Sequence, residues 1–139
     1  MNLSLRDAFA RFGAKPSNRL RGLSAMATDG ALVLNCSQAY FGHPSRGVLR
    51  YEDRLSRQTS GNGETELLGR HLTLACADAL PVRMVVSFRA DEKNASGSPG
   101  CHVRPDLIGK VAEFDGDRFI VDFTRREALR PATESGRRK

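Results

Sequence analysis

The stretch from Val82 to Phe88 constrains the fold more than any other part of the sequence. It reads VRMVVSF and follows Pro81, which ends the helical pattern before it. Alternate residues share one side of the predicted strand, namely Val82, Met84, Val86 and Phe88. Val85 makes the other side apolar too, which is typical of a central strand covered on both faces. We therefore expect a sheet with helices packed against it.

Three segments have the spacing of helices. The first, from Leu3 to Phe12, begins with Ser4 and Asp7 in a capping-box-like arrangement. The last, from about Glu64 to Leu80, has an apolar stripe that includes Leu68, Leu72 and Ala75. Between them, residues 46–57 place apolar side chains at helical spacing, namely Val48, Tyr51 and Leu55. We predict a helix for each segment.

Two hairpins complete the expected fold. Asp29-Gly30 and Asp115-Gly116 are turn dipeptides between alternating apolar runs, over 23–36 and 109–123. Residues 90–104 have the polar, Gly- and Pro-containing composition of a long loop. We expect an α+β fold with a mostly antiparallel five-stranded sheet, or a small mixed barrel, and about three flanking helices. Residues 1–126 are predicted to form a single compact domain, and residues 127–139 a disordered basic tail.

Composition excludes several classes of protein. With 139 residues, 40% hydrophobic and 27% charged, the chain has the make-up of an ordinary globular domain. Its longest apolar runs are only a few residues, so no membrane partner is expected. The first residues lack the features of a secretion signal, which favours a cytoplasmic location. The three cysteines, Cys36, Cys76 and Cys101, are therefore expected to be reduced thiols.

Positive charge is concentrated in two parts of the chain. The net charge of +6 divides into +5 over residues 1–57, −3 over residues 58–124 and +4 over residues 125–139. Such asymmetry is typical of a protein with a nucleic-acid or other anionic partner. A second interpretation stays open, because 18 of the 22 basic residues are Arg and a GC-rich genome also favours Arg.

The helix predicted over 46–57 would carry an arginine stripe opposite its apolar side. Its members are Arg46, Arg50, Arg54 and Arg57. Arg19 and Arg21 precede the first hairpin, and Arg137-Arg138-Lys139 end the chain, so all these groups could contact a phosphate backbone. Tyr40 and Phe41 lie near the stripe in sequence and are the only aromatic pair placed to stack on a base. Alternatively, the arginines form a solvated helix face that pairs with Glu52 or Asp53.

Catalytic and metal sites are poorly supported. The Cys and His residues lack the short paired spacing of a structural zinc site, so we expect no metal or other cofactor. Pro105-Asp106 resembles the opening of a nuclease signature, but the following strand has no Lys two residues beyond its acid. The glycines before Glu64 lack the Lys-Ser/Thr of a phosphate loop, and Glu64 and Glu66 would repel phosphate. The chain is therefore more readily a binding protein than an enzyme.

Three functional hypotheses follow. The first is a non-catalytic nucleic-acid-binding module that contacts phosphates through the arginine stripe. The second is a protein-interaction or regulatory module, whose acidic protein partner would contact the same surface or the 90–104 loop. The third is a small-ligand-binding protein or enzyme with a pocket near Tyr40, His43 and His102.

Overall fold

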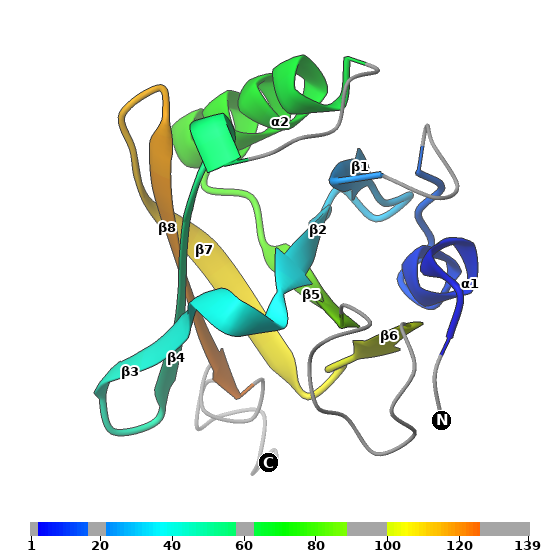
Figure 1. Ribbon diagram of the computed structural model, residues 1–139, viewed down its shortest axis with the longest axis horizontal. Coiled ribbons are helices and arrows are strands. Elements are labelled where there is room, and N and C mark those ends of the chain that lie inside the picture. The colour runs from blue at the N-terminus through cyan, green and yellow to red at the C-terminus, as the bar shows by residue number, and fades with distance from the viewer. Residues whose placement is uncertain (1–2, 17–21, 58–62, 89–99, 126–139) are drawn as a thin grey trace, which may run out of the picture.

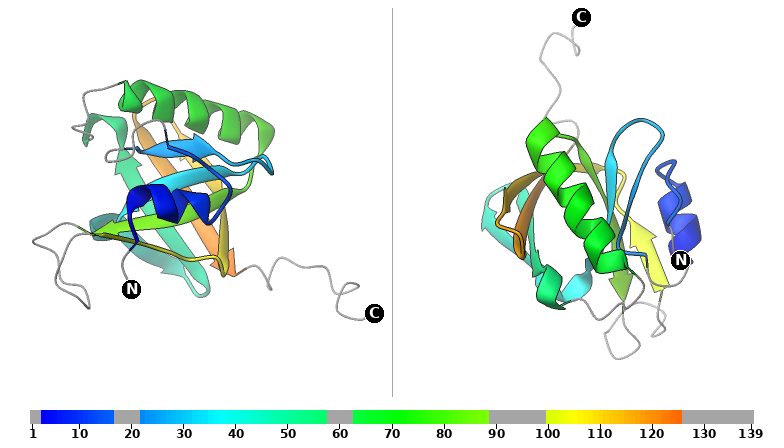
Figure 2. Two further views of the ribbon diagram at one scale, coloured as in Figure 1. Left: turned by 90° about the vertical axis from the view of Figure 1, so that its right-hand side faces the viewer. Right: turned by 90° about the horizontal axis from the view of Figure 1, so that it is seen from above.

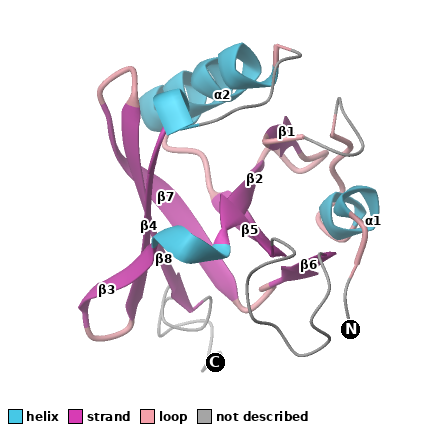
Figure 3. Ribbon diagram, in the orientation of Figure 1, coloured by secondary structure: helices cyan, strands magenta, loops and turns pink. Residues whose placement is uncertain are grey.

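The computed structural model describes residues 3–16, 22–57, 63–88 and 100–125, and within them the fold is α+β. Figure 1 labels its elements, and Figure 3 separates helices from strands. The helices are α1 (Leu5–Ala10) and α2 (Glu64–Asp78), with short 3-10 turns η1 (Gln38–Tyr40) and η2 (Leu55–Arg57). The strands are β1 (Ser24–Met26), β2 (Leu32–Ser37), β3 (Phe41–Ser45), β4 (Val48–Arg54), β5 (Val82–Phe88), β6 (Gly100–Val103), β7 (Leu107–Phe114) and β8 (Arg118–Arg125).

All eight strands belong to one mixed, open sheet. Its order is β1-β2-β5-β7-β8-β4-β3, and β6 also pairs with β5. The β2–β5 pair is parallel, and the other pairs are antiparallel. β2 lies near one end of this order, yet it continues through η1 directly into β3 at the other end. The sheet is therefore strongly curled, as the views in Figure 2 show.

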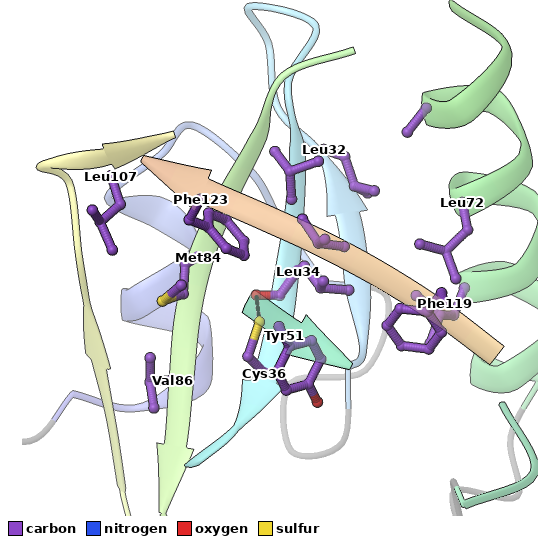
Figure 4. Close-up of a cluster of buried hydrophobic side chains, with 14 residues drawn as sticks. Leu32, Leu34, Cys36, Tyr51, Leu72, Met84, Val86, Leu107, Phe119 and Phe123 are labelled. Atoms are coloured by element: carbon purple, nitrogen blue, oxygen red, sulfur yellow. Dashed lines mark hydrogen bonds between the residues drawn. The ribbon is translucent and has the colours of Figure 1, made fainter. Parts of the chain in front are cut away.

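The main core fills the concave side of this curled sheet. Figure 4 shows side chains from β2, β4, β5, β7 and β8 pointing toward one another. α2 covers one end and adds Leu68, Leu72 and Ala75, which are all buried. The helix was predicted from this apolar stripe, and its observed bounds agree with the prediction.

A second core lies under α1 on the other side of β2 and β5. Ala8 and Phe9 of α1 are fully buried there with Val33 and Val85. The Ser4 side chain accepts a hydrogen bond from the Asp7 backbone at 3.1 Å and so caps α1, as predicted. Val85 packs in this core while Val82, Met84 and Val86 pack in the main one, which confirms that β5 is a central strand covered on both sides.

The structure corrects the predicted number of elements. Within the described residues there are eight strands instead of five and two α-helices instead of three, and the sheet is open, so the barrel alternative is wrong. One added strand, β6, lies inside the predicted 90–104 loop, where Gly100–Val103 pairs with β5. Residues 90–99 of that loop and the predicted tail 127–139 lie outside the described residues.

The largest correction concerns residues 46–57. Instead of the predicted helix, they form the turn after β3, the whole of β4 and the short η2. Ser45 pairs with Val48 around a two-residue turn, where Gly47 has a φ of +81°. Glycine adopts this left-handed conformation without the strain of a side chain. In β4, Tyr51 and Asp53 point inward and are each 2% exposed. The apolar spacing that predicted a helix arises from two strand positions and one residue of η2.

Candidate nucleic-acid interface

Two members of the predicted arginine stripe lie on one face of the sheet, because β4 alternates its side chains. Arg50, Glu52 and Arg54 project from the outer side of β4, opposite the buried Tyr51 and Asp53. Arg46 is exposed in the turn between β3 and β4, and Arg57 belongs to η2. Strand geometry thus places only Arg50 and Arg54 of the stripe on the outer face of β4.

Arg50 is held by a carboxylate on the neighbouring strand. Asp122 of β8 lies directly opposite Arg50 in the antiparallel register. The Nε and Nη2 atoms of Arg50 donate to the two carboxylate oxygens of Asp122 at 2.7 and 2.9 Å. The hydrogen bond to Asp122 raises the pKa of the Arg50 guanidinium. This bidentate contact fixes the plane of the guanidinium group.

Arg118 bridges two carboxylates on either side of its own strand. Its Nε donates to Glu52 at 2.6 Å, and its Nη1 donates to Glu113 at 3.3 Å. The hydrogen bond from Arg118 lowers the pKa of Glu52. Ile120 lies between these two acids in the register and is only 2% exposed, although it is on the outer face. The ion pairs therefore shield an apolar patch at the centre of the surface.

Arg57 is anchored by a buried carboxylate. Its Nη1 donates to Asp53 Oδ1 at 3.3 Å, and the Tyr51 hydroxyl donates to Asp53 Oδ2 at 2.7 Å. Ser37 in turn donates its backbone N–H to the Tyr51 oxygen at 2.9 Å, which connects β2 to β4. Burial raises the pKa of the Tyr51 hydroxyl, so it remains protonated. Asp53 thus connects Tyr51, inside the sheet, to Arg57 at its surface.

Arg57 also stacks on Tyr40. Its guanidinium carbon lies 4.4 Å from the centre of the Tyr40 ring, within the range of a cation–π contact. The Tyr40 side chain is 37% exposed, and it lines a surface hollow of about 340 Å³. The rest of the lining comes from β3 and β4, namely Phe41, Gly42, His43, Pro44, Arg50 and Glu52. The hollow therefore combines aromatic rings, a guanidinium group, an imidazole and a carboxylate.

The structure brings together only some of the predicted site residues. Tyr40 and Arg50 line the hollow, and Arg57 stacks on Tyr40. Arg54 turns instead to Asp117, with Nη1 3.4 Å from the carboxylate. Arg46 is exposed in the turn but is not part of the hollow's lining. Arg19, Arg21 and residues 137–139 lie outside the described residues.

The hollow also contains two of the three residues of the predicted ligand pocket. His43 lines it together with Tyr40, whereas His102 lies on β6 and is not part of the lining. Phe41 lines the hollow beside Tyr40, the neighbour with which it was expected to form an aromatic pair, whereas Pro44 was not expected at the site. Both lie on β3, whose pairing with β4 was not predicted.

The described residues contain nearly equal numbers of basic and acidic side chains. The described residues include 13 basic and 12 acidic side chains. The remaining nine basic and four acidic side chains, which account for most of the net charge of +6, belong to the other segments. Arginines 50, 54 and 57 each form an ion pair, but only Arg57 pairs with a carboxylate that the alternative interpretation named, which is Asp53. Sequence alone gave no sign of two of their partners, Asp117 and Asp122, because both belong to a distant hairpin.

Two other polar clusters lack the features of a reactive site. Ser24 and His71 share a hydrogen bond of 2.7 Å between Oγ and Nδ1, but Ser24 is fully buried under α2. Burial raises the pKa values of the Cys36 and Cys101 thiols, so both are poor nucleophiles at neutral pH. Among the described residues, no group of three or more His, Cys, Asp or Glu side chains is arranged to hold a metal ion.

Comparisons with known protein families, with curated proteins and with solved structures found no match to this chain. Neither helix of the described residues is long and apolar enough to cross a membrane.

Proposed function

We propose that this chain is a small non-catalytic module that binds nucleic acid. In this proposal, the hollow beside Tyr40 receives one unpaired base and basic side chains contact the neighbouring phosphates. The exposed Tyr40 ring carries the proposal, because Arg57 holds it in place next to a hollow lined by Phe41, His43 and Arg50. Aromatic rings stack on bases of any sequence, and arginine adds to that stacking.

The ion pair of Arg50 is compatible with phosphate binding. A guanidinium group has five N–H donors. Asp122 accepts one from Nε and one from Nη2, which leaves three for a ligand. Because the pair already fixes the side chain, little rotamer freedom remains to be lost when a phosphate binds. Asp122 thus orients Arg50 beside the hollow.

The charge distribution supports phosphate contacts by basic side chains from more than one part of the chain. The described residues are nearly neutral, whereas the other segments have nine basic and four acidic side chains. Affinity for a polyanion would then come mainly from those segments, while the hollow would select unpaired bases. Each phosphate contacted on a single strand contributes a slope of about −0.7 to the dependence of log affinity on log salt.

Fluorescence anisotropy with labelled single-stranded DNA, single-stranded RNA and duplex DNA tests the proposal. We expect single strands to bind more tightly than duplex, and three phosphate contacts would weaken binding roughly 20-fold between about 50 and 200 mM salt. Tyr40→Ala should remove the preference for single strands, because base stacking is worth about 1–3 kcal/mol.

Arg6→Ala is the matched control, since Arg6 is exposed on α1, far from β3 and β4 in Figure 1. It removes one positive charge and should leave the preference for single strands unchanged. Absence of binding to all three nucleic acids at low salt would contradict the proposal and favour the acidic protein partner instead.

A further inference from the structure

The outer face of α2 exposes an apolar side chain. Leu74 is 43% exposed, and it and Tyr40 are the only large apolar side chains exposed among the described residues. The opposite face of α2 packs into the main core through Leu68 and Leu72. Leu74 therefore contributes little to the folded monomer.

A groove of about 720 Å³ runs beside Leu74. One wall is the outer face of α2, and the other is formed by Leu55, Phe114 and Gly116. Leu55 can approach α2 because Gly69 has no side chain, and an added Cβ there would lie 3.4 Å from Leu55 Cδ1. The Thr73 hydroxyl donates to the Gly69 carbonyl at 2.8 Å, so its hydrogen-bonding need is met within the helix. The groove is thus suited to apolar contact.

Charges flank Leu74 in a self-complementary order. Arg70 and Asp78 are both exposed, and each lies four residues from Leu74, which is about 6 Å along the helix axis. Within the described residues neither of them forms an ion pair. If a second α2 lies antiparallel with the two-fold axis at Leu74, each Arg70 faces the Asp78 of the other copy.

We propose that two copies of this chain associate through an antiparallel pair of α2 helices centred on Leu74. This contact covers the Leu74 side chains of both copies and forms two Arg70–Asp78 ion pairs. A second copy is the favoured occupant because the order Arg70, Leu74, Asp78 runs in the reverse direction on an antiparallel α2. Each basic side chain then faces an acidic one, and the two leucines face each other. The contact is independent of the hollow, since β3 and α2 lie at opposite ends of the molecule in Figure 1.

Charge exchange gives a direct test by sedimentation velocity over a range of protein concentrations. The wild-type chain should associate as the concentration rises. Arg70→Asp and Asp78→Arg each place two like-charged pairs in the interface, and each should weaken the dimer at least about tenfold. The double exchange R70D/D78R should restore association, because it reverses the order of charges without changing their complementarity.

Mixing the two single variants provides a second test. One variant then has only acidic and the other only basic side chains at positions 70 and 78, so the mixture should form a heterodimer although neither variant dimerises alone. Leu74→Ala should weaken every one of these dimers. Arg6→Asp, which changes the charge by the same amount on α1, should have no effect.

All samples need a reductant, because Cys76 is exposed on α2 and could cross-link two copies. Circular dichroism should show the same helix content in each variant, which separates loss of association from unfolding. A wild-type chain that stays monomeric at sub-millimolar concentration would overturn the proposal, as would a mixture of the single variants that fails to associate.

Discussion

Arg50 and Asp122 face each other across β4 and β8, and two parallel N–H···O bonds of 2.7 and 2.9 Å join them. The pair both orients Arg50 beside the hollow and neutralises it. Asp122 thus favours phosphate binding by orienting the guanidinium group, and it opposes phosphate binding by cancelling the positive charge of that group. This relationship makes the charge of Asp122 a sensitive test of the proposed interface.

Asp122→Asn should strengthen the binding of single-stranded DNA. The amide keeps the size of the side chain and one acceptor for Arg50, but it removes the negative charge near the proposed phosphates. We expect the salt dependence to become steeper by up to about 0.7, the slope of one further phosphate contact. Anisotropy titrations at several salt concentrations measure this slope. An unchanged affinity and slope would mean that the charge of Asp122 does not oppose phosphate binding at Arg50.

Tyr51→Phe should destabilise the fold. The change removes the hydroxyl that accepts from Ser37 and donates to Asp53, and so leaves two part-buried or buried polar groups without this partner. A loss of that kind costs about 1–3 kcal/mol in the free energy of unfolding, which urea denaturation measures. Tyr40→Phe is the matched control, and because Tyr40 is exposed it should lower stability by less than about 0.5 kcal/mol.

Gly109→Ala should be among the most damaging single-methyl additions. Gly109 pairs with both Val82 and Phe123, and a Cβ there would lie 2.6 Å from Phe123 Cδ1 and 2.9 Å from the Asp122 carbonyl. Since the ring is fully buried, it cannot move away freely, and we expect a loss of about 1–3 kcal/mol. Gly47→Ala strains a positive φ but meets open space, so it should cost only about 1–2 kcal/mol. Thermal unfolding of both variants ranks them.

His71 should make the fold less stable in mild acid. Burial lowers the pKa of His71, with a further contribution from Arg70, while Glu64 opposes the shift. The folded chain then binds fewer protons than the unfolded chain, so stability falls as the pH drops below the ordinary histidine value of about 6.5 and through the lowered pKa. His71→Gln should reduce this loss. His102, whose pKa burial also lowers, should account for part of the remaining dependence.

The elements predicted correctly from sequence are those with local signals. Ser4 caps α1 through Asp7, three residues away, and the Asp-Gly dipeptides form turns between strands that pair with each other. β5 has apolar residues at positions that face both sides of the strand, so its burial needed no knowledge of its neighbours. In each case the decisive interactions join residues that are close in sequence or depend on burial alone.

The hairpin of β3 and β4 could not be predicted from local signals, because its order of polar and apolar residues depends on contacts with residues distant in sequence, such as those of β8. An inward-facing aspartate breaks the alternation expected of a strand, and Asp53 is tolerated there because Tyr51 and Arg57 satisfy it. Some of the candidate site residues nevertheless lie close together in the structure. Tyr40, Arg50 and Arg57 lie near one another in sequence, and this nearness survives the change from helix to strand.

The parallel pairing of β2 with β5 imposes an order on folding. Leu32 pairs with Val82, so β3, β4 and α2 must all leave the ribosome before the two central strands can meet. Until then β2 has an unpaired edge and two apolar faces, which is the kind of surface that chaperones bind and that aggregation exploits. Contacts so distant in sequence also slow folding. The nascent chain is therefore expected to depend on prompt synthesis of β5, and truncation before β5 should leave an insoluble product.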